Sequence, residues 1–177
     1  MTRHITDYLV QEHQELSLLL NDLHEQLGVL RLARDRRRTA ERLTGLGRKI
    51  SAAFNAHVAQ EEQILYPALE NNVEGIAFTL DRMRQEHDAG EQTADSFRGS
   101  VDRLLHGKGN PGEVMQKGQR YVAWVRNHLL DENGRLFPMV ERGLDEEIQQ
   151  AVRRAMEELR QESSARVAEG QTLTAQA

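Results

Sequence analysis

Cysteine is absent from the sequence, and proline and aromatic residues are scarce. The absence of cysteine excludes disulfides, thiolate-bound zinc, iron–sulfur clusters and thiol chemistry. All three prolines come after residue 66, and this composition favours a helix-rich protein. No apolar run is long enough to cross a membrane and no apolar signal segment opens the chain, so we expect a cytoplasmic protein without membrane contact. The net charge of −5 argues against nucleic acid as a partner.

The sequence contains two copies of one motif. The first copy runs from His57 to Pro67, and the second copy, 71 residues later, runs from His128 to Pro138. Each copy reads His-x-x-x-Glu, followed by leucine, an aromatic residue and proline at the same offsets. A single His-x-x-x-Glu is often only a polar pair on a helix surface. Two copies with matching ends are much harder to reach by chance, so the repeat indicates a metal site.

A further histidine stands upstream of each copy, and each follows a glutamate, in Glu12-His13 and Glu86-His87. The chain is therefore a twofold internal repeat, which suggests two helical hairpins. On a helix, Glu12 and Glu86 are rotated by about 100° from the neighbouring histidines. We therefore expect both glutamates at the surface or behind the ligands, and not as direct ligands.

Helix geometry brings the repeated residues to one point. Residues four apart are about 40° apart around a helix axis and roughly 6 Å apart along it, so the histidine and glutamate of each motif face the same way. Four imidazoles and two carboxylates around one point suit two metal ions bridged by the glutamates. Imidazole and carboxylate without thiolate suit iron, manganese or zinc, and two bridging carboxylates in a bundle favour paired iron. The predicted ligands are His13, His57, His87, His128, Glu61 and Glu132.

This pattern, with its Leu-Tyr-Pro and Leu-Phe-Pro endings, resembles the hemerythrin-like cation-binding family over roughly residues 4 to 142. The resemblance implies an all-α, up-down four-helix bundle with a non-haem di-iron centre, its two iron ions joined by an oxo or hydroxo bridge. Ferritin-like di-iron proteins use Glu-x-x-His, which is absent from the sequence. We expect the bundle over residues 1–143, an extra amphipathic helix over 144–163 and a flexible tail over 164–177.

Glu91 forms a third His-x-x-x-Glu with His87 and is a further candidate ligand. The spacing predicts that Glu91 faces the core one turn from His87, and the alternative is a solvated or supporting carboxylate. Oxygen-carrying members of the family have a fifth histidine on the third helix, where this sequence has Glu91. They also have a longer His-to-Asp spacing in place of the second His-x-x-x-Glu.

Apolar periodicity and turn signals place the remaining features. The first helix is expected to begin near Thr6 or Asp7. The later bundle helices are expected over about 39–69, 74–105 and 113–141. The arginine-rich segment 31–38 is predicted to be a solvated connection or a helix start, with a partner-binding patch as the alternative. His24 is predicted to lie at the surface or the bundle end, since it is about 16 Å from His13 along the helix. Trp124, four residues before His128, is predicted to wall the site.

Two classes of function remain open. One is a module that binds or senses O2 or NO reversibly. The other is a di-iron enzyme that acts on peroxide or nitric oxide. Family members that donate iron for iron–sulfur cluster repair share the four histidines and two glutamates, but carry a cysteine-bearing N-terminal segment, and this sequence has no cysteine. The chain is expected to be a monomer or a homodimer.

Overall fold

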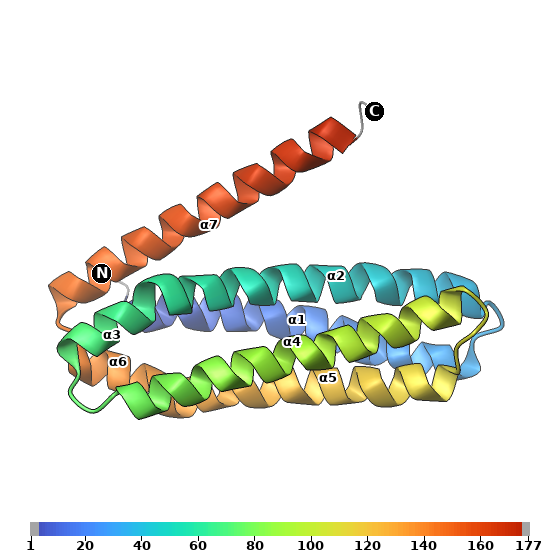
Figure 1. Ribbon diagram of the computed structural model, residues 1–177, viewed down its shortest axis with the longest axis horizontal. Helices are drawn as coiled ribbons and strands as arrows, with labels where there is room; N and C mark the ends of the chain where they lie inside the picture. Colours follow the sequence, from blue (N-terminus) through green and yellow to red (C-terminus); the bar gives the residue numbers. More distant parts are fainter. Residues whose placement is uncertain (1–3, 175–177) are drawn as a thin grey trace.

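Two helical hairpins make up the body of the molecule. In the computed structural model, which describes residues 4–174 and their side chains as far as residue 162, the first hairpin is α1 (Ile5–Leu32) and α2 (Arg36–Gln60). The second hairpin is α4 (Ala77–Leu105) and α5 (Pro111–Asp131). Each hairpin helix contacts its own partner and one helix of the other hairpin, α1 against α5 and α2 against α4. Figure 1 shows the four helices side by side. The predicted all-α, up-down four-helix bundle is confirmed, and the described part contains no strand.

Each of the motif helices is interrupted by a π-helical turn that begins at the motif glutamate. These turns are η1 (Glu61–Leu65) and η2 (Glu132–Leu136), followed by the short helices α3 (Tyr66–Asn72) and α6 (Phe137–Gly143). In both turns the N–H after the turn bonds to the glutamate carbonyl five residues earlier. The proline in the first turn of each short helix has no N–H, and its ring clashes with a carbonyl four residues back. A π turn changes which carbonyl each N–H bonds to along the helix. Each of the two helices predicted as continuous therefore consists of three segments.

Helix α7 (Glu146–Thr174) follows the bundle and lies outside it (Figure 1). Its first half contacts α1, α2 and η1, and it buries Val152 and Met156. The extra helix is longer than the predicted 144–163, so the predicted tail is helical as far as Thr174. Residues 163–174 contain no proline, so nothing in this segment breaks the helix by ring clash. Residues 175–177 lie outside the described part of the chain. Within that part, no helix has both the length and the apolar character needed to cross a membrane.

The core consists of two apolar clusters with a polar layer between them. The larger cluster fills the end of the bundle near the α1–α2 connection and includes Leu20, Leu43 and Phe97. The smaller cluster fills the end near α3 and α6 and includes Leu9 and Tyr66, together with the buried residues of α7. His13, four residues after Leu9 and three before Leu16, comes between the two clusters in the sequence of α1. The clusters exclude water from both ends of this layer.

The connections follow the local sequence, with one difference at the start. Asp35 caps α2 by accepting from the N–H of Arg38, and the arginine-rich segment around it is exposed, as predicted for a solvated connection. Asp7 does not precede α1 but lies in its first turn, where its carboxylate accepts from the N–H of His4. Gly107 has a φ of 71° in the α4–α5 loop, a backbone angle that favours glycine.

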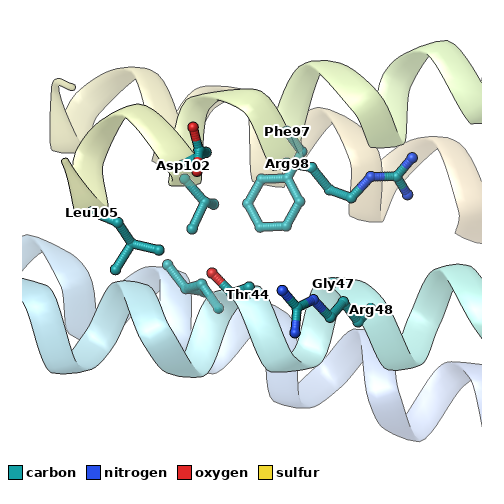
Figure 2. A pocket seen from close by; sticks show the side chains of 9 residues that line it. Thr44, Gly47, Arg48, Phe97, Arg98, Asp102 and Leu105 are labelled. Carbon is teal, nitrogen blue, oxygen red and sulfur yellow. The ribbon is translucent and has the colours of Figure 1, made fainter. Parts of the chain in front are cut away.

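A shallow apolar hollow of about 230 Å³ lies between α2 and α4. Figure 2 shows the ring of Phe97 above Gly47, with Arg48 and Asp102 at the rim. This hollow is at the end of the bundle near the α1–α2 connection. It does not include any of the residues in the polar layer.

Candidate metal centre

All six predicted ligands are buried in the polar layer, and each of the four bundle helices contributes one histidine. The two glutamates are inaccessible, and the histidines are between 1% and 6% exposed. A hydrophobic bundle does not bury this many ionisable groups unless they are paired or bind a metal. The six residues are His13 on α1, His57 on α2, His87 on α4, His128 on α5, Glu61 at the start of η1 and Glu132 at the start of η2.

The four imidazoles form two pairs, one from each hairpin. In the first histidine pair, Nε2 of His13 lies 3.2 Å from Nε2 of His57. In the second histidine pair, the ring centres of His87 and His128 are 4.9 Å apart. The two sets of donor atoms that lie close enough to hold an ion divide in the same way, and they share Glu132. The geometry therefore offers two neighbouring cation positions.

Glu132 reaches both pairs, with one carboxylate oxygen toward each. Its Oε2 lies 3.0 Å from Nε2 of His13 and 3.4 Å from Nε2 of His57. Its Oε1 lies 2.8 Å from Nε2 of His128 and 4.0 Å from Nε2 of His87. A carboxylate with this placement can bridge two ions.

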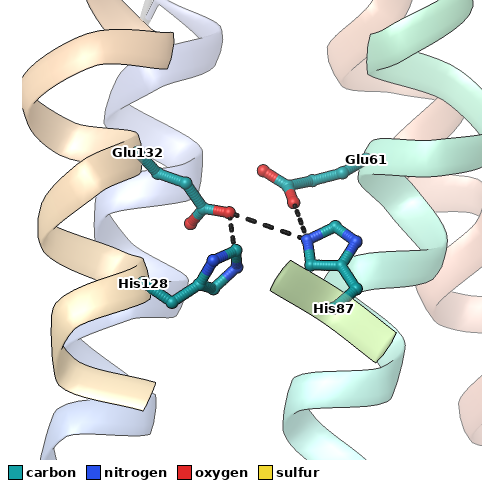
Figure 3. A group of neighbouring side chains, drawn as sticks. All are labelled: Glu61, His87, His128 and Glu132. Carbon is teal, nitrogen blue, oxygen red and sulfur yellow. Dashed lines mark ion pairs between the residues drawn. The ribbon is translucent and has the colours of Figure 1, made fainter. Parts of the chain in front are cut away.

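Glu61 faces Glu132 across the site (Figure 3). Its two oxygens are also divided between the histidine pairs. Its Oε2 lies 3.4 Å from Nε2 of His87, and its Oε1 lies 3.8 Å from Nε2 of His57. The hydroxyl of Tyr66 donates to Oε2 at 3.2 Å. Burial and the neighbouring glutamates raise the pKa of Tyr66 well above its ordinary value, so the hydroxyl keeps its proton. Glu61 groups more closely with the second histidine pair than with the first.

Each of the four histidines of the site has a side chain behind it that accepts a hydrogen bond from its Nδ1. His57 donates to Glu12 at 3.1 Å, and His128 donates to Glu86 at 3.3 Å. Both accepting glutamates come from the partner helix of the same hairpin, where each directly precedes a candidate ligand. This settles the two alternatives for Glu12 and Glu86: they support the ligands. A bond at Nδ1 fixes the tautomer that leaves Nε2 free to bind a metal.

The other two histidines are held from the opposite hairpin. Nδ1 of His87 lies 2.6 Å from Oε1 of Glu62, and Nδ1 of His13 lies 3.2 Å from Oδ1 of Asn133. Glu62 and Asn133 directly follow the motif glutamates, so the repeat places them in equivalent positions. The two residues differ in charge, and the second pair therefore has one more carboxylate behind it.

The aromatic residues of the motifs also brace the opposite hairpin. The ring of Tyr66 is stacked on His87, with centres 6.1 Å apart, and the ring of Phe137 is stacked on His13 at 5.1 Å. Trp124 is stacked on His128 at 5.2 Å, in agreement with its predicted role as a wall. These contacts fix the planes of the imidazoles as well as their positions.

Charge interactions dominate the titration of the buried groups. Burial by itself lowers the pKa of His87, but hydrogen bonds with Glu132, Glu61 and Glu62 raise it to about 10. Burial similarly opposes the charge of His57, and the surrounding glutamates hold its pKa well above the ordinary value. Burial raises the pKa of Glu132, yet its histidine partners hold it well below the ordinary range. Metal binding would therefore release protons from the imidazoles.

Several atoms in this layer lack a hydrogen-bond partner of suitable geometry. They include Oε1 of Glu61, Nε2 of His87, Nε2 of His128 and Oε1 of Glu132. Buried polar atoms are almost always satisfied, and these four belong to residues whose donor atoms lie within 4.8 Å of one another. The donor set is imidazole nitrogen and carboxylate oxygen, which are ligands of iron, manganese and zinc. The residues present therefore fit a pair of metal ions.

Sequence comparison independently indicates cation binding. The family model for the hemerythrin HHE cation-binding domain matches residues 4–140. The chain belongs to the hemerythrin HHE cation-binding family. Curated proteins give no significant match to the chain. Helix α7 follows the matched region, so it is an addition to the hemerythrin domain in this chain.

Within the hemerythrin domain, the prediction that Glu91 faces the core is wrong. Glu91 is exposed, and it lies outside both sets of donor atoms that could hold a cation. His87 is near the edge of the buried face of α4, so a rotation of about 40° takes Glu91 toward solvent. The inward position is that of Gly90, where an added Cβ would lie 2.2 Å from the indole of Trp124. The ring of Trp124 fills the space into which a side chain at position 90 would project.

Sequence reasoning missed several residues that support the ligands. Glu62 and Asn133 were missed, although their places directly after the two motif glutamates were the available signal. Gln60 was missed as well, and it donates to both oxygens of Glu12, at 3.0 Å and 3.2 Å. Nothing in the repeat points to Arg160 of α7, which also donates to Glu12. His24, by contrast, is exposed, as predicted.

Proposed function

We propose that the chain holds two iron ions between its histidine pairs and uses them to bind or sense a small molecule, O2 or NO. The observation that carries this proposal is Glu132, whose two oxygens each face one histidine pair. The proposed ligands are the four histidines with Glu61 and Glu132. A non-haem iron pair supplies an electron-rich centre at which a diatomic molecule can bind reversibly.

The protein's own part is to fix the ligands and to keep the layer dry. The apolar clusters close both ends of the layer, and the Nδ1 bonds orient the imidazoles. A surface hollow of about 280 Å³ lies between α2, η1 and α4, and of the six proposed ligands His87 is in its lining. Phe54, Val58, Glu62 and Glu91 also line it. A hollow beside a proposed ligand supports the approach of a small molecule from this side.

The test begins with anaerobic loading of the purified chain with Fe(II), removal of free metal and measurement of iron per chain. The expected result is two iron ions per chain. Optical spectra recorded with O2, NO and azide should then show new bands, and those of the O2 or NO adduct should disappear when the gas is removed. One ion per chain, or retention of zinc in preference to iron after iron-replete expression, would contradict the proposal.

The same sample separates binding from catalysis. Peroxide or nitric oxide consumed over many turnovers, with iron retained, would identify the di-iron enzyme in place of the binding protein. Loss of iron to an apo acceptor, without consumption of either molecule, would identify an iron donor. One molecule held per iron pair and released on dilution would support the binding function.

A further inference from the structure

We propose that Arg160 of α7 is a positioning residue for the first metal position, and that α7 docking and metal binding there strengthen one another. The proposal rests on the proposed metal function and concerns a helix outside the matched hemerythrin domain. Its basis is a continuous chain of contacts from Arg160 through Glu12 to His57.

Glu12 is the central member of this chain of contacts. It is 7% exposed, and its carboxylate makes four contacts with three donor groups. Oε2 accepts from Nδ1 of His57 at 3.1 Å and from Gln60 at 3.2 Å. Oε1 accepts from Gln60 at 3.0 Å and from Nη1 of Arg160 at 3.0 Å. Arg160 is the permanent cation among these three partners, so it supplies the positive charge that a buried carboxylate requires.

Arg160 can be in this position only when α7 is docked. Met156, one turn before it, is fully buried in the smaller apolar cluster, and Val152 is buried one turn earlier. The second terminal nitrogen of Arg160 bonds to Glu15 at 2.9 Å, one turn after Glu12 on α1. The planar guanidinium therefore clamps α7 to α1 and completes the shell of Glu12 in the same contact.

The second half of the repeat lacks such a helix. Glu86 holds His128 as Glu12 holds His57, but its guanidinium partner is Arg82 of the same helix, at 3.6 Å. The side chain of Glu86 is 28% exposed, against 8% for Glu12. Water can thus replace a lost partner at Glu86, whereas Glu12 depends on α7. The two histidine pairs are equivalent in their ligands but differ in what lies behind them.

The consequence follows from the cost of an unpaired buried carboxylate. Without Arg160, Glu12 gains hydration by turning toward solvent, and His57 then loses the partner that fixes its orientation. Loss of such a supporting bond weakens metal binding by about 10–100-fold, and we expect the lower end because Gln60 remains. Coupling is reciprocal in binding free energy, so metal at the first position should also hold α7 more firmly in place.

The experiment compares chelator-driven metal release from the full chain, loaded in parallel with Fe(II) and Zn(II). Arg160→Gln should speed release of one ion of the two by about tenfold, the release of the other being unchanged. Arg160→Lys, which keeps the charge at one contact, should recover most of the difference. Arg82→Gln is the matched control in the other hairpin, and it should leave both rates near the native values.

Glu15→Gln separates the contact with Glu12 from docking alone. It loosens the same clamp without touching the shell of His57, so it should affect metal release less than Arg160→Gln. Hydrogen exchange of amides 150–160 measures the reverse direction. Metal loading should slow this exchange in the native chain and should slow it much less in Arg160→Gln.

Each outcome has one meaning for the inference. The inference would be overturned if Arg160→Gln speeds the release of both ions equally, since Arg160 would then act on general stability alone. A faster release of one ion in Arg82→Gln, as large as that in Arg160→Gln, would overturn it too. Exchange in α7 that does not depend on metal would also overturn it. If the Arg160 variants change zinc release as expected while iron fails to load, the inference stands and the proposed di-iron function fails. A chain that binds neither metal overturns both.

Discussion

At the scale of single residues, the two glutamates of the site differ in how far they reach. Glu132 belongs to both sets of donor atoms that can hold a cation, and Glu61 belongs to the set around the second histidine pair. Glu132→Gln keeps the shape of the side chain and removes its charge. We therefore expect Glu132→Gln to lose both ions and Glu61→Gln to keep close to one ion per chain. Metal analysis after desalting measures this, and equal loss in the two variants would rule out the difference in bridging.

The residues behind the histidines give a second prediction at this scale. Glu62→Gln leaves His87 without its carboxylate partner and should weaken the second position by about 10–100-fold. Asn133→Asp is the reciprocal change, because it gives His13 the carboxylate that the repeat lacks there, and it should tighten the first position. Titration against a competing chelator measures both affinities. If neither variant changes the affinity, the bonds at Nδ1 do not control the metal positions.

At the scale of helices, the sequence predicts the ligands better than the path of the backbone. The spacing of His57 and Glu61 places them on one face, because four residues are close to one turn, and the structure brings both to the buried layer. The path of the backbone after Glu61 depends on which main-chain hydrogen bonds form, and there a π turn replaces the α turn. Pro67 was the available signal, but a proline equally permits a kink or a helix end, so the π turn was not predictable from it alone.

Glu91 shows the same limit for the position of a side chain. The four-residue spacing gives its direction relative to His87, but the buried arc of α4 depends on how closely α5 packs. That packing is set by the indole of Trp124 against Gly90, a contact between residues 34 positions apart in the chain. The contacts of Arg160 on α1 escape prediction for the same reason. Local periodicity contains no information on which distant helix covers a face.

The contact between α4 and α5 leads to a prediction about Gly90. Replacement of a glycine by alanine within a helix favours the helix by about 1 kcal/mol. At position 90 the new methyl group would overlap the indole of Trp124, and overpacking of this kind costs about 1–3 kcal/mol. Gly90→Ala should therefore lower the free energy of unfolding, as measured by urea denaturation of the metal-free chain.

A double variant provides the control for Gly90. Trp124→Leu removes the overlapping ring, so Gly90→Ala should cost much less in that background and could become stabilising. The difference between the two costs is the coupling between the residues. Equal costs in both backgrounds would show that the methyl group is accommodated without displacement of the indole.

At the scale of the whole molecule, the two hairpins complete each other's ligands. The first hairpin and its extension supply Glu62 and Tyr66 to His87, and the second supplies Asn133 and Phe137 to His13. Neither hairpin alone has a complete metal position, since the first position includes Glu132 of the second hairpin and the second position includes Glu61 of the first. The layer therefore forms only when the bundle assembles, and the free energy of metal binding adds to the free energy of folding.

This coupling predicts a metal-dependent stability for the bundle. Free metal at about 100 times the dissociation constant of one position adds about 2.7 kcal/mol to the free energy of unfolding. For a chain of this length, each kcal/mol raises the midpoint of thermal unfolding, Tm, by about 2–4 °C, so each filled position should raise Tm by about 5–10 °C. The larger cluster includes residues of all four bundle helices, and the smaller one joins α1 and α4 to the segments that continue α2 and α5, so unfolding should stay a single transition. Calorimetry with and without metal measures the rise in Tm. In Glu132→Gln, the rise is measured from the variant's own metal-free Tm, and most of it should be lost. An equal rise in Glu132→Gln would mean that the added metal acts at the surface and not in the layer between the clusters.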